Sequence, residues 1–139
     1  MLTGKLYKYA LVLLFIISVI SCSKTEDPAT PGGDVRDKLV GTWVCNEKSK
    51  LSGTSSYNIT ISKSTTSSDG IIIKNFYQQG ANASNFASVD GNSITITAPY
   101  VGSNTIRGGG TYSSSSNLTF TYTVDDGQKV DSVTATCHM

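Results

Sequence analysis

The stretch Asn117-Leu118-Thr119-Phe120-Thr121-Tyr122-Thr123-Val124-Asp125 decides the fold class of this sequence. Its apolar side chains alternate with threonines, so a strand built from it carries apolar groups on one face and hydroxyls on the other. Threonine is β-branched and therefore favours a strand while keeping the outer face soluble. The same period of two recurs within residues 57–62 and 94–98. No stretch shows a convincing helical period, so an all-β protein is predicted.

Turn signals separate the apolar stretches at nearly regular distances. They are single glycines and Asp-Gly pairs, and Asp-Gly supplies the positive φ values of tight hairpin turns. Eight strands joined by short turns most simply close into an antiparallel up-and-down (lipocalin-like) barrel, which leaves no exposed sheet edge. A two-sheet β-sandwich is the alternative. The predicted strands span residues 41–49, 55–63, 70–78, 84–90, 92–99, 103–112, 117–125 and 129–138.

The composition excludes several classes of function. Serine and threonine number 20 and 17, which together exceed a quarter of the 139 residues. The outer faces of β-strands account for this surplus without any catalytic serine. A formal net charge of +1, from 11 basic and 10 acidic side chains, leaves no basic surplus for nucleic acid.

The first 21 residues differ from the rest of the chain. Lys5 and Lys8 precede an uncharged, apolar stretch over residues 9–20. It is too short for a membrane-crossing helix, which takes roughly 20 residues, and fits the core of a secretory signal peptide. The residues that follow this stretch indicate the kind of segment. The alternatives to a lipoprotein signal peptide are an ordinary signal peptide and a membrane anchor that stays uncut.

The flank Val19-Ile20-Ser21-Cys22 resembles a bacterial lipobox. The resemblance implies cleavage before Cys22 and acyl chains, such as palmitate, on that cysteine. We therefore expect a lipoprotein signal peptide at 1–21 and a lipid-anchored, flexible tether at 22–34, because the tether holds two prolines and a glycine pair. The expected location is the cell envelope, on the outer membrane, facing the periplasm or the surface.

The segment 35–139 opens on Leu39-Val40-Gly41-Thr42-Trp43-Val44, with a Gly-x-Trp motif in its first strand. This motif resembles the lipocalin signature, and the segment resembles the compact lipocalin-like domains of bacterial lipoproteins. The resemblance implies an eight-stranded barrel, with Trp43 at its closed end and a ligand cavity. The sequence departs from full lipocalins because it is shorter and lacks the basic residue that follows their last strand.

Two cysteines remain once Cys22 is lipidated. Cys45 lies on the first predicted strand and Cys137 on the last, and these strands are neighbours in a closed meander. Because an exported domain meets oxidising conditions, we expect a Cys45–Cys137 disulfide, with two buried free thiols as the alternative. Two cysteines and one histidine lack the spacing of a metal site, so no metal is expected.

The sequence shows no arrangement of catalytic residues. His138 is the only histidine, and it is the penultimate residue. Glu47 is the only glutamate of the domain, and a Gly-x-Ser-x-Gly motif is absent. Arg107 precedes three glycines and either meets a ligand anion or faces solvent. We therefore expect neither an enzyme nor a cofactor.

Two functions remain open. The first is a lipid-anchored binding protein that holds a small apolar or amphipathic ligand in a short barrel. The second is a surface interaction module with a solid core, whose loops contact another protein such as an envelope protein or a hydrolase, or a glycan. Under either function we expect a monomer. An inward cavity above about 300 Å³ favours the first, whereas a filled barrel with aromatic loop tips favours the second. The candidate ligand-binding residues, which could instead simply fill the core, are Trp43, Tyr57, Phe76, Tyr100, Phe120 and Tyr122.

Overall fold

The structure is a computed structural model that describes residues 33–98, 100–114 and 116–139. The predicted signal peptide, Cys22 and the tether up to residue 32 lie outside the described residues. Within the described ranges, two short 3₁₀ segments, η1 (Val35–Lys38) and η2 (Phe76–Gln78), accompany nine strands. The strands are β1 (Gly41–Ser49), β2 (Gly53–Lys63), β3 (Gly70–Lys74), β4 (Ser84–Asp90), β5 (Ser93–Ala98), β6 (Tyr100–Val101), β7 (Asn104–Ser114), β8 (Asn117–Asp125) and β9 (Val130–His138).

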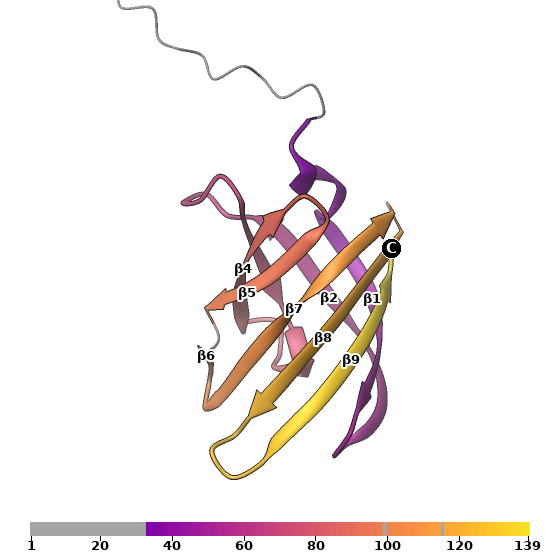
Figure 1. Ribbon diagram of the computed structural model, residues 1–139, viewed down its shortest axis with the longest axis vertical. Helices are drawn as coiled ribbons and strands as arrows, with labels where there is room; N and C mark the ends of the chain where they lie inside the picture. Colours follow the sequence, from indigo (N-terminus) through magenta and orange to yellow (C-terminus); the bar gives the residue numbers. More distant parts are fainter. Residues whose placement is uncertain (1–32, 99, 115) are drawn as a thin grey trace, which may run out of the picture. The chain divides into compact units, whose positions relative to one another are not determined.

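Eight of these strands form a closed antiparallel ring, visible in Figure 1. Each pairs with its neighbour in the chain, β1 pairs with β9, and β5 pairs with β7 across the remaining gap. The two-residue strand β6 pairs with β7 alongside this ring. The predicted up-and-down barrel is therefore confirmed, and the two-sheet sandwich is wrong because the β5–β7 pairing closes the sheet on itself.

The observed strand bounds differ from the predicted ones in one place that matters. The strand expected at 70–78 ends at Lys74, because Asn75 adopts a left-handed φ of 60° that breaks the ladder. The chain then turns inward as η2, which Figure 1 shows within the lower end of the barrel. Tyr77 and Gln78 also have positive φ values, 52° and 56°. A segment predicted as strand is thus a strained turn that enters the barrel.

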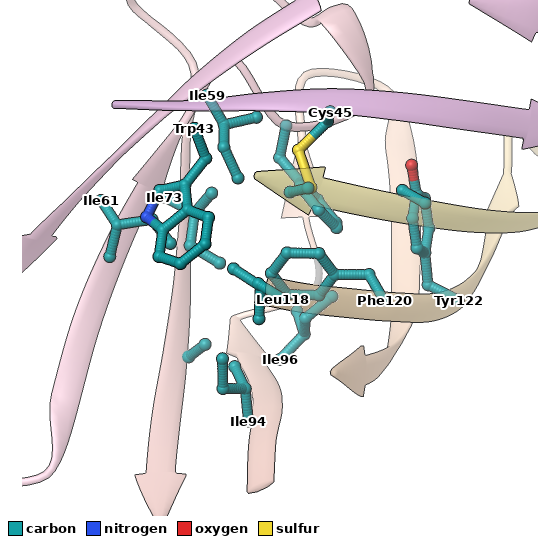
Figure 2. Close-up of a cluster of buried hydrophobic side chains, with 14 of the residues drawn as sticks. Trp43, Cys45, Ile59, Ile61, Ile73, Ile94, Ile96, Leu118, Phe120 and Tyr122 are labelled. Carbon is teal, nitrogen blue, oxygen red and sulfur yellow. A yellow bond between two sulfur atoms is a disulfide. The ribbon is translucent and has the colours of Figure 1, made fainter. Parts of the chain in front are cut away.

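Apolar side chains fill the middle of the barrel. Figure 2 shows Trp43, Leu118 and Phe120 among the isoleucines of the neighbouring strands. All three are at most 1% exposed, as expected for the inward set of each alternating strand. The Trp43 indole N–H donates to the carbonyl of Leu39 at 2.8 Å, just after η1. Trp43 is therefore buried at the end of the barrel where η1 leads into β1, and its part in closing that end stays a prediction.

Three glycines allow the barrel to close at β7. A Cβ on Gly109 would overlap the carbonyl oxygen of Ile94 on β5, and a Cβ on Gly108 would overlap that of Thr121 on β8. Gly108 also has a φ of 141°, which side chains rarely allow. The glycines therefore let β7 bend and approach both neighbours closely, a role that glycine plays in other closed sheets.

A disulfide joins the first and last strands. Cys45 and Cys137 are register partners in the β1–β9 ladder, with Cα atoms 4.0 Å apart, and their sulfurs are bonded. Both cysteines are fully buried. The predicted pairing is thus present in the structure. Neither 3₁₀ segment of the described residues has the length and apolar character of a membrane-crossing helix.

Candidate functional site

The barrel end opposite Trp43 carries a hollow of about 360 Å³, which we call the mouth hollow. Turns β1–β2, β6–β7 and β8–β9 surround it, and η2 contributes from the β3–β4 connection. Its apolar lining comes from Leu51, Tyr77 and Val124. Its polar lining comes from Ser52, Asn104, Asp126, Lys129 and Asp131. The mixture suits a small molecule that has both an apolar and a polar part.

Segment η2 holds Tyr77 at this hollow by burying the residue before it. The ring of Phe76 is fully buried, with its centroid 5.0 Å from that of Phe120 and 4.6 Å from that of Tyr122. The backbone N–H of Tyr77 donates to the hydroxyl of Tyr57 at 3.2 Å. A bulky residue at positive φ is strained, and such strain is kept where surrounding contacts impose it, often at functional sites.

Asp131 ties η2 to the β1–β2 turn. Its Oδ2 accepts from the hydroxyls of Ser49 at 2.5 Å and Tyr77 at 3.1 Å, and its Oδ1 accepts from the N–H groups of Lys50 and Leu51 at 3.0 and 3.1 Å. Burial by itself would raise the pKa of Asp131, but these hydrogen bonds outweigh burial and hold the pKa below its usual value. With four donors, the carboxylate has little capacity left for a ligand. Asp131 therefore shapes the hollow.

A second buried carboxylate lies deeper in the same half of the barrel. Glu47 is 4% exposed, and its Oε2 accepts from the hydroxyls of Tyr57, at 2.5 Å, and Tyr122. Burial is the largest cause that raises the pKa of both tyrosines, and the hydrogen bond to Glu47 raises it further in each. Both phenols therefore stay protonated and donate to the carboxylate. Among the described residues, no cation forms an ion pair with Glu47.

Asn85 is an unpaired polar group inside the barrel. It lies at the second position of β4, close to the connection that forms η2, and it is fully buried. Neither its side-chain oxygen nor its side-chain nitrogen has a hydrogen-bond partner among the described residues. An unpaired buried amide costs about 1–3 kcal/mol, so it marks a position where a further polar group would be stabilised.

The aromatic residues predicted as ligand contacts lie mainly in the core. Trp43, Phe76, Phe120 and Tyr122 are at most 2% exposed and pack against other side chains, while Tyr57 is half-buried. Tyr100 belongs to β6, of which the structure describes only the backbone at this position. The structure brings Phe76, Phe120 and Tyr122 together, with Tyr57 joined to Tyr122 through Glu47. Their role in ligand binding stays a prediction.

Sequence reasoning overlooked the polar residues that point inward. Asp131 begins the alternating series that continues through Val133 and Ala135, and Glu47 follows Trp43 and Cys45 in the same way. Each is a carboxylate in an apolar register, and that mismatch is the signal that could have identified it. His138 is exposed, and no group of three or more potential metal ligands occurs within the described ranges.

Comparisons with known proteins agree with the architecture. Neither a scan of protein families nor a search of curated proteins found a match. Among solved structures, the redesigned β-barrel b11L5F_LGL matches with a TM-score of 0.51 and 18% identity, over 76% of this chain and 95% of that one. The redesigned β-barrel mFAP1, in complex with DFHBI, matches with a TM-score of 0.51 and 21% identity, over 76% and 99%. EF1p2_mFAP2b, also bound to DFHBI, matches with a TM-score of 0.50 and 18% identity, over 76% and 96%. At these identities the likeness shows the fold alone.

Proposed function

We propose that this protein is a lipid-anchored binding protein of the cell envelope that holds a small amphipathic ligand in the mouth hollow. The observation that carries the proposal is the hollow itself, whose volume of about 360 Å³ lies within the lower part of the usual range for ligand pockets. The lipobox resemblance at Cys22 supports the anchor and the envelope location. The disulfide supports an oxidising compartment.

The lining of the hollow supports a ligand with two chemically different parts. Leu51 and Val124 offer aliphatic surface and Tyr77 offers an aromatic ring, which together suit a compact apolar group. Lys129 and Asn104, which also line the hollow, supply donors for a polar or anionic group. The interior beyond η2 is packed, so the ligand resides at the mouth of the barrel and not at its centre.

Two further observations support binding at this end. The strained backbone of η2 has less to lose on rearrangement than a relaxed turn, and the unpaired amide of Asn85 is buried near the start of β4, the strand that follows η2 in the chain. A ligand polar group that reached Asn85 would satisfy a costly buried amide. In addition, mFAP1 and EF1p2_mFAP2b have barrels of this fold and hold DFHBI, so the fold can accept a small molecule.

Native mass spectrometry of the mature lipoprotein tests the proposal, with the protein purified in mild detergent from the membranes of its own cells. Leu51→Glu places a charge in the hollow without burying it, because Leu51 is 57% exposed. Val40→Glu is the matched control, an exposed aliphatic residue outside the strands near the closed end. We expect a small-molecule adduct on the natural protein and on Val40→Glu, and its loss on Leu51→Glu.

Replacement of Asn85 by leucine separates two roles for the unpaired amide. If the ligand uses this amide, Asn85→Leu raises the melting temperature of the ligand-free protein and removes the adduct. An adduct that survives in Asn85→Leu confines the ligand to the outer part of the hollow. Absence of any adduct on the natural protein, or equal adducts on Leu51→Glu and Val40→Glu, would contradict binding in the mouth hollow.

A further inference from the structure

A second concave surface lies on the outer face of the barrel wall, on the opposite side of the sheet from the core. This outer groove has a volume of about 540 Å³ and spans β7, β8, β9 and β1. Its first row of side chains runs Arg107, Thr123, Ser132 and Lys50, which the strand pairings place side by side. A second row runs Thr121, Thr134 and Lys48. These outward positions take no part in the core or in the mouth hollow.

The side chains that line the groove carry positive charge only, and the nearest outward carboxylate is that of Asp125, two positions beyond Thr123 on β8. Its three ionisable side chains are Lys48, Lys50 and Arg107, all exposed. Within the described ranges none of them forms an ion pair. The carboxylates of Glu47 and Asp131, on the same strands, point inward and are hydrogen-bonded there. The groove therefore favours an anionic partner.

The dimensions of the groove suit an extended partner. Arg107 on β7 and Lys50, directly after the end of β1, are separated by three strand spacings, or about 14 Å along the sheet, so in their outward positions they present two separate cationic points. Between them lie the hydroxyls of Thr121, Ser132 and Thr134, none of which forms a side-chain hydrogen bond within the described part of the chain. Hydroxyls that can both donate and accept, set beside threonine methyl groups, match a chain of sugar rings.

We infer that the outer groove binds an acidic polysaccharide, one that carries carboxylate or sulfate groups on successive sugars. Arg107 and Lys50 would each hold an acidic group, and the hydroxyl floor would bond the sugar hydroxyls between them. Other polyanions fit less well. The groove exposes no aromatic side chain for the base stacking that single-stranded nucleic acids need, because Tyr122 is 2% exposed. Its three cations also fall below the four to eight, roughly, that characterise anionic-lipid patches.

Isothermal titration calorimetry at physiological ionic strength tests the inference. It measures the binding of dextran sulfate, polygalacturonate and neutral dextran to the full chain. We expect at least one of the two acidic polymers to bind and neutral dextran not to bind. The double variant Lys50→Gln/Arg107→Gln should weaken the interaction by about tenfold or more, because two charge-assisted contacts are lost. The matched control, Lys38→Gln/Lys74→Gln, removes the same charge at exposed sites elsewhere and should stay within about twofold.

A third variant tests shape without any change of charge. Thr134→Phe fills the centre of the groove at an exposed strand position that tolerates aromatic residues. It should abolish binding of the acidic polymer while the circular dichroism spectrum and melting temperature stay near those of the natural protein. Equal losses in the test and control double variants, equal binding of neutral dextran, or binding only to anionic lipid vesicles would each overturn the inference. The polymer that binds more tightly identifies the acidic group as carboxylate or sulfate.

Discussion

Reduction of the Cys45–Cys137 disulfide should remove a large part of the stability of the barrel. The bond joins residues 92 positions apart and thereby closes almost the whole domain into one loop. In the chain-entropy treatment, opening a loop of this length costs about 4.6 kcal/mol at 25 °C, through the greater freedom of the unfolded chain. Domains of this kind have total stabilities of about 5–15 kcal/mol, so the loss is a large fraction.

Urea unfolding of residues 33–139 measures this loss. Tryptophan fluorescence monitors the unfolding, with and without a phosphine reductant. With a slope of about 1.5 kcal/mol per molar urea, the midpoint should fall by about 3 M on reduction. The slope itself should rise, because an unfolded chain without the cross-link exposes more surface. Trp43 is a suitable probe, since it is the only tryptophan and is fully buried in the folded barrel.

The variant Cys45→Ala/Cys137→Ala provides the control, because its midpoint should lie close to that of the reduced protein and should not respond to reductant. The entropic reasoning would be refuted if reduction of the natural protein lowered stability by less than about 1 kcal/mol. It would also be refuted if stability fell with no change in slope, since the loss would then arise in the folded state.

Three other predictions concern the closure and the polar interior. Gly109→Ala should destabilise the barrel by about 1–3 kcal/mol, because the new methyl group overlaps the backbone of β5. Gly127 has open space around it, so Gly127→Ala should lower the stability by only about 1 kcal/mol, because of the positive φ at that position. Asp131 has a lowered pKa in the folded protein, so the stability that it contributes is present above about pH 4 and is lost as the pH falls through the folded pKa. The variant Asp131→Asn should therefore be less stable than the natural protein at pH 7 and should lose that part of the pH dependence of stability. Tyr122→Phe should lower the stability by about 1–3 kcal/mol, because the buried carboxylate of Glu47 loses a donor. The hydroxyl of Tyr112 makes no hydrogen bond within the described residues, so Tyr112→Phe should change the stability little.

Urea and thermal unfolding between pH 2 and 7 check these three predictions. Equal effects of the two glycine replacements would mean that the close approach of β7 to β5 does not matter for closure. If the stability of Asp131→Asn fell at low pH as steeply as that of the natural protein, the Asp131 carboxylate would not be what stabilises the mouth hollow. Equal costs for the two tyrosine replacements would mean that the hydrogen bond to Glu47 contributes nothing.

Much of the fold could be predicted because the strands show their period directly. The bounds predicted for residues 41–49, 84–90 and 117–125 are those observed in β1, β4 and β8. The departure at η2 could not be predicted, since Asn75, Tyr77 and Gln78 adopt positive φ values that only tertiary contacts impose on residues other than glycine.

The candidate site was less accessible from the sequence than the fold. The carboxylates of Glu47 and Asp131 occupy inward positions that the alternation itself reveals, so a search for polar residues in apolar registers would have found them. The outer groove is different in kind. It unites Lys48 with Thr134 and Arg107, which are distant in sequence and are brought onto one surface only by the β1–β9, β8–β9 and β7–β8 pairings. A surface of this kind requires the strand register, which composition and periodicity do not contain.

The most direct test of ligand binding at the mouth compares amide NMR spectra of two preparations of isotope-labelled full chain. One is purified in mild detergent from the membranes of its own cells, and the other is stripped of small molecules by unfolding and refolded with its disulfide intact. We predict chemical-shift differences concentrated at Leu51, Tyr77, Asn104 and residues 124–131, with the closed end around Trp43 unchanged. Identical spectra, or differences confined to the outer wall at Arg107 and Thr134, would contradict a ligand held in the mouth hollow.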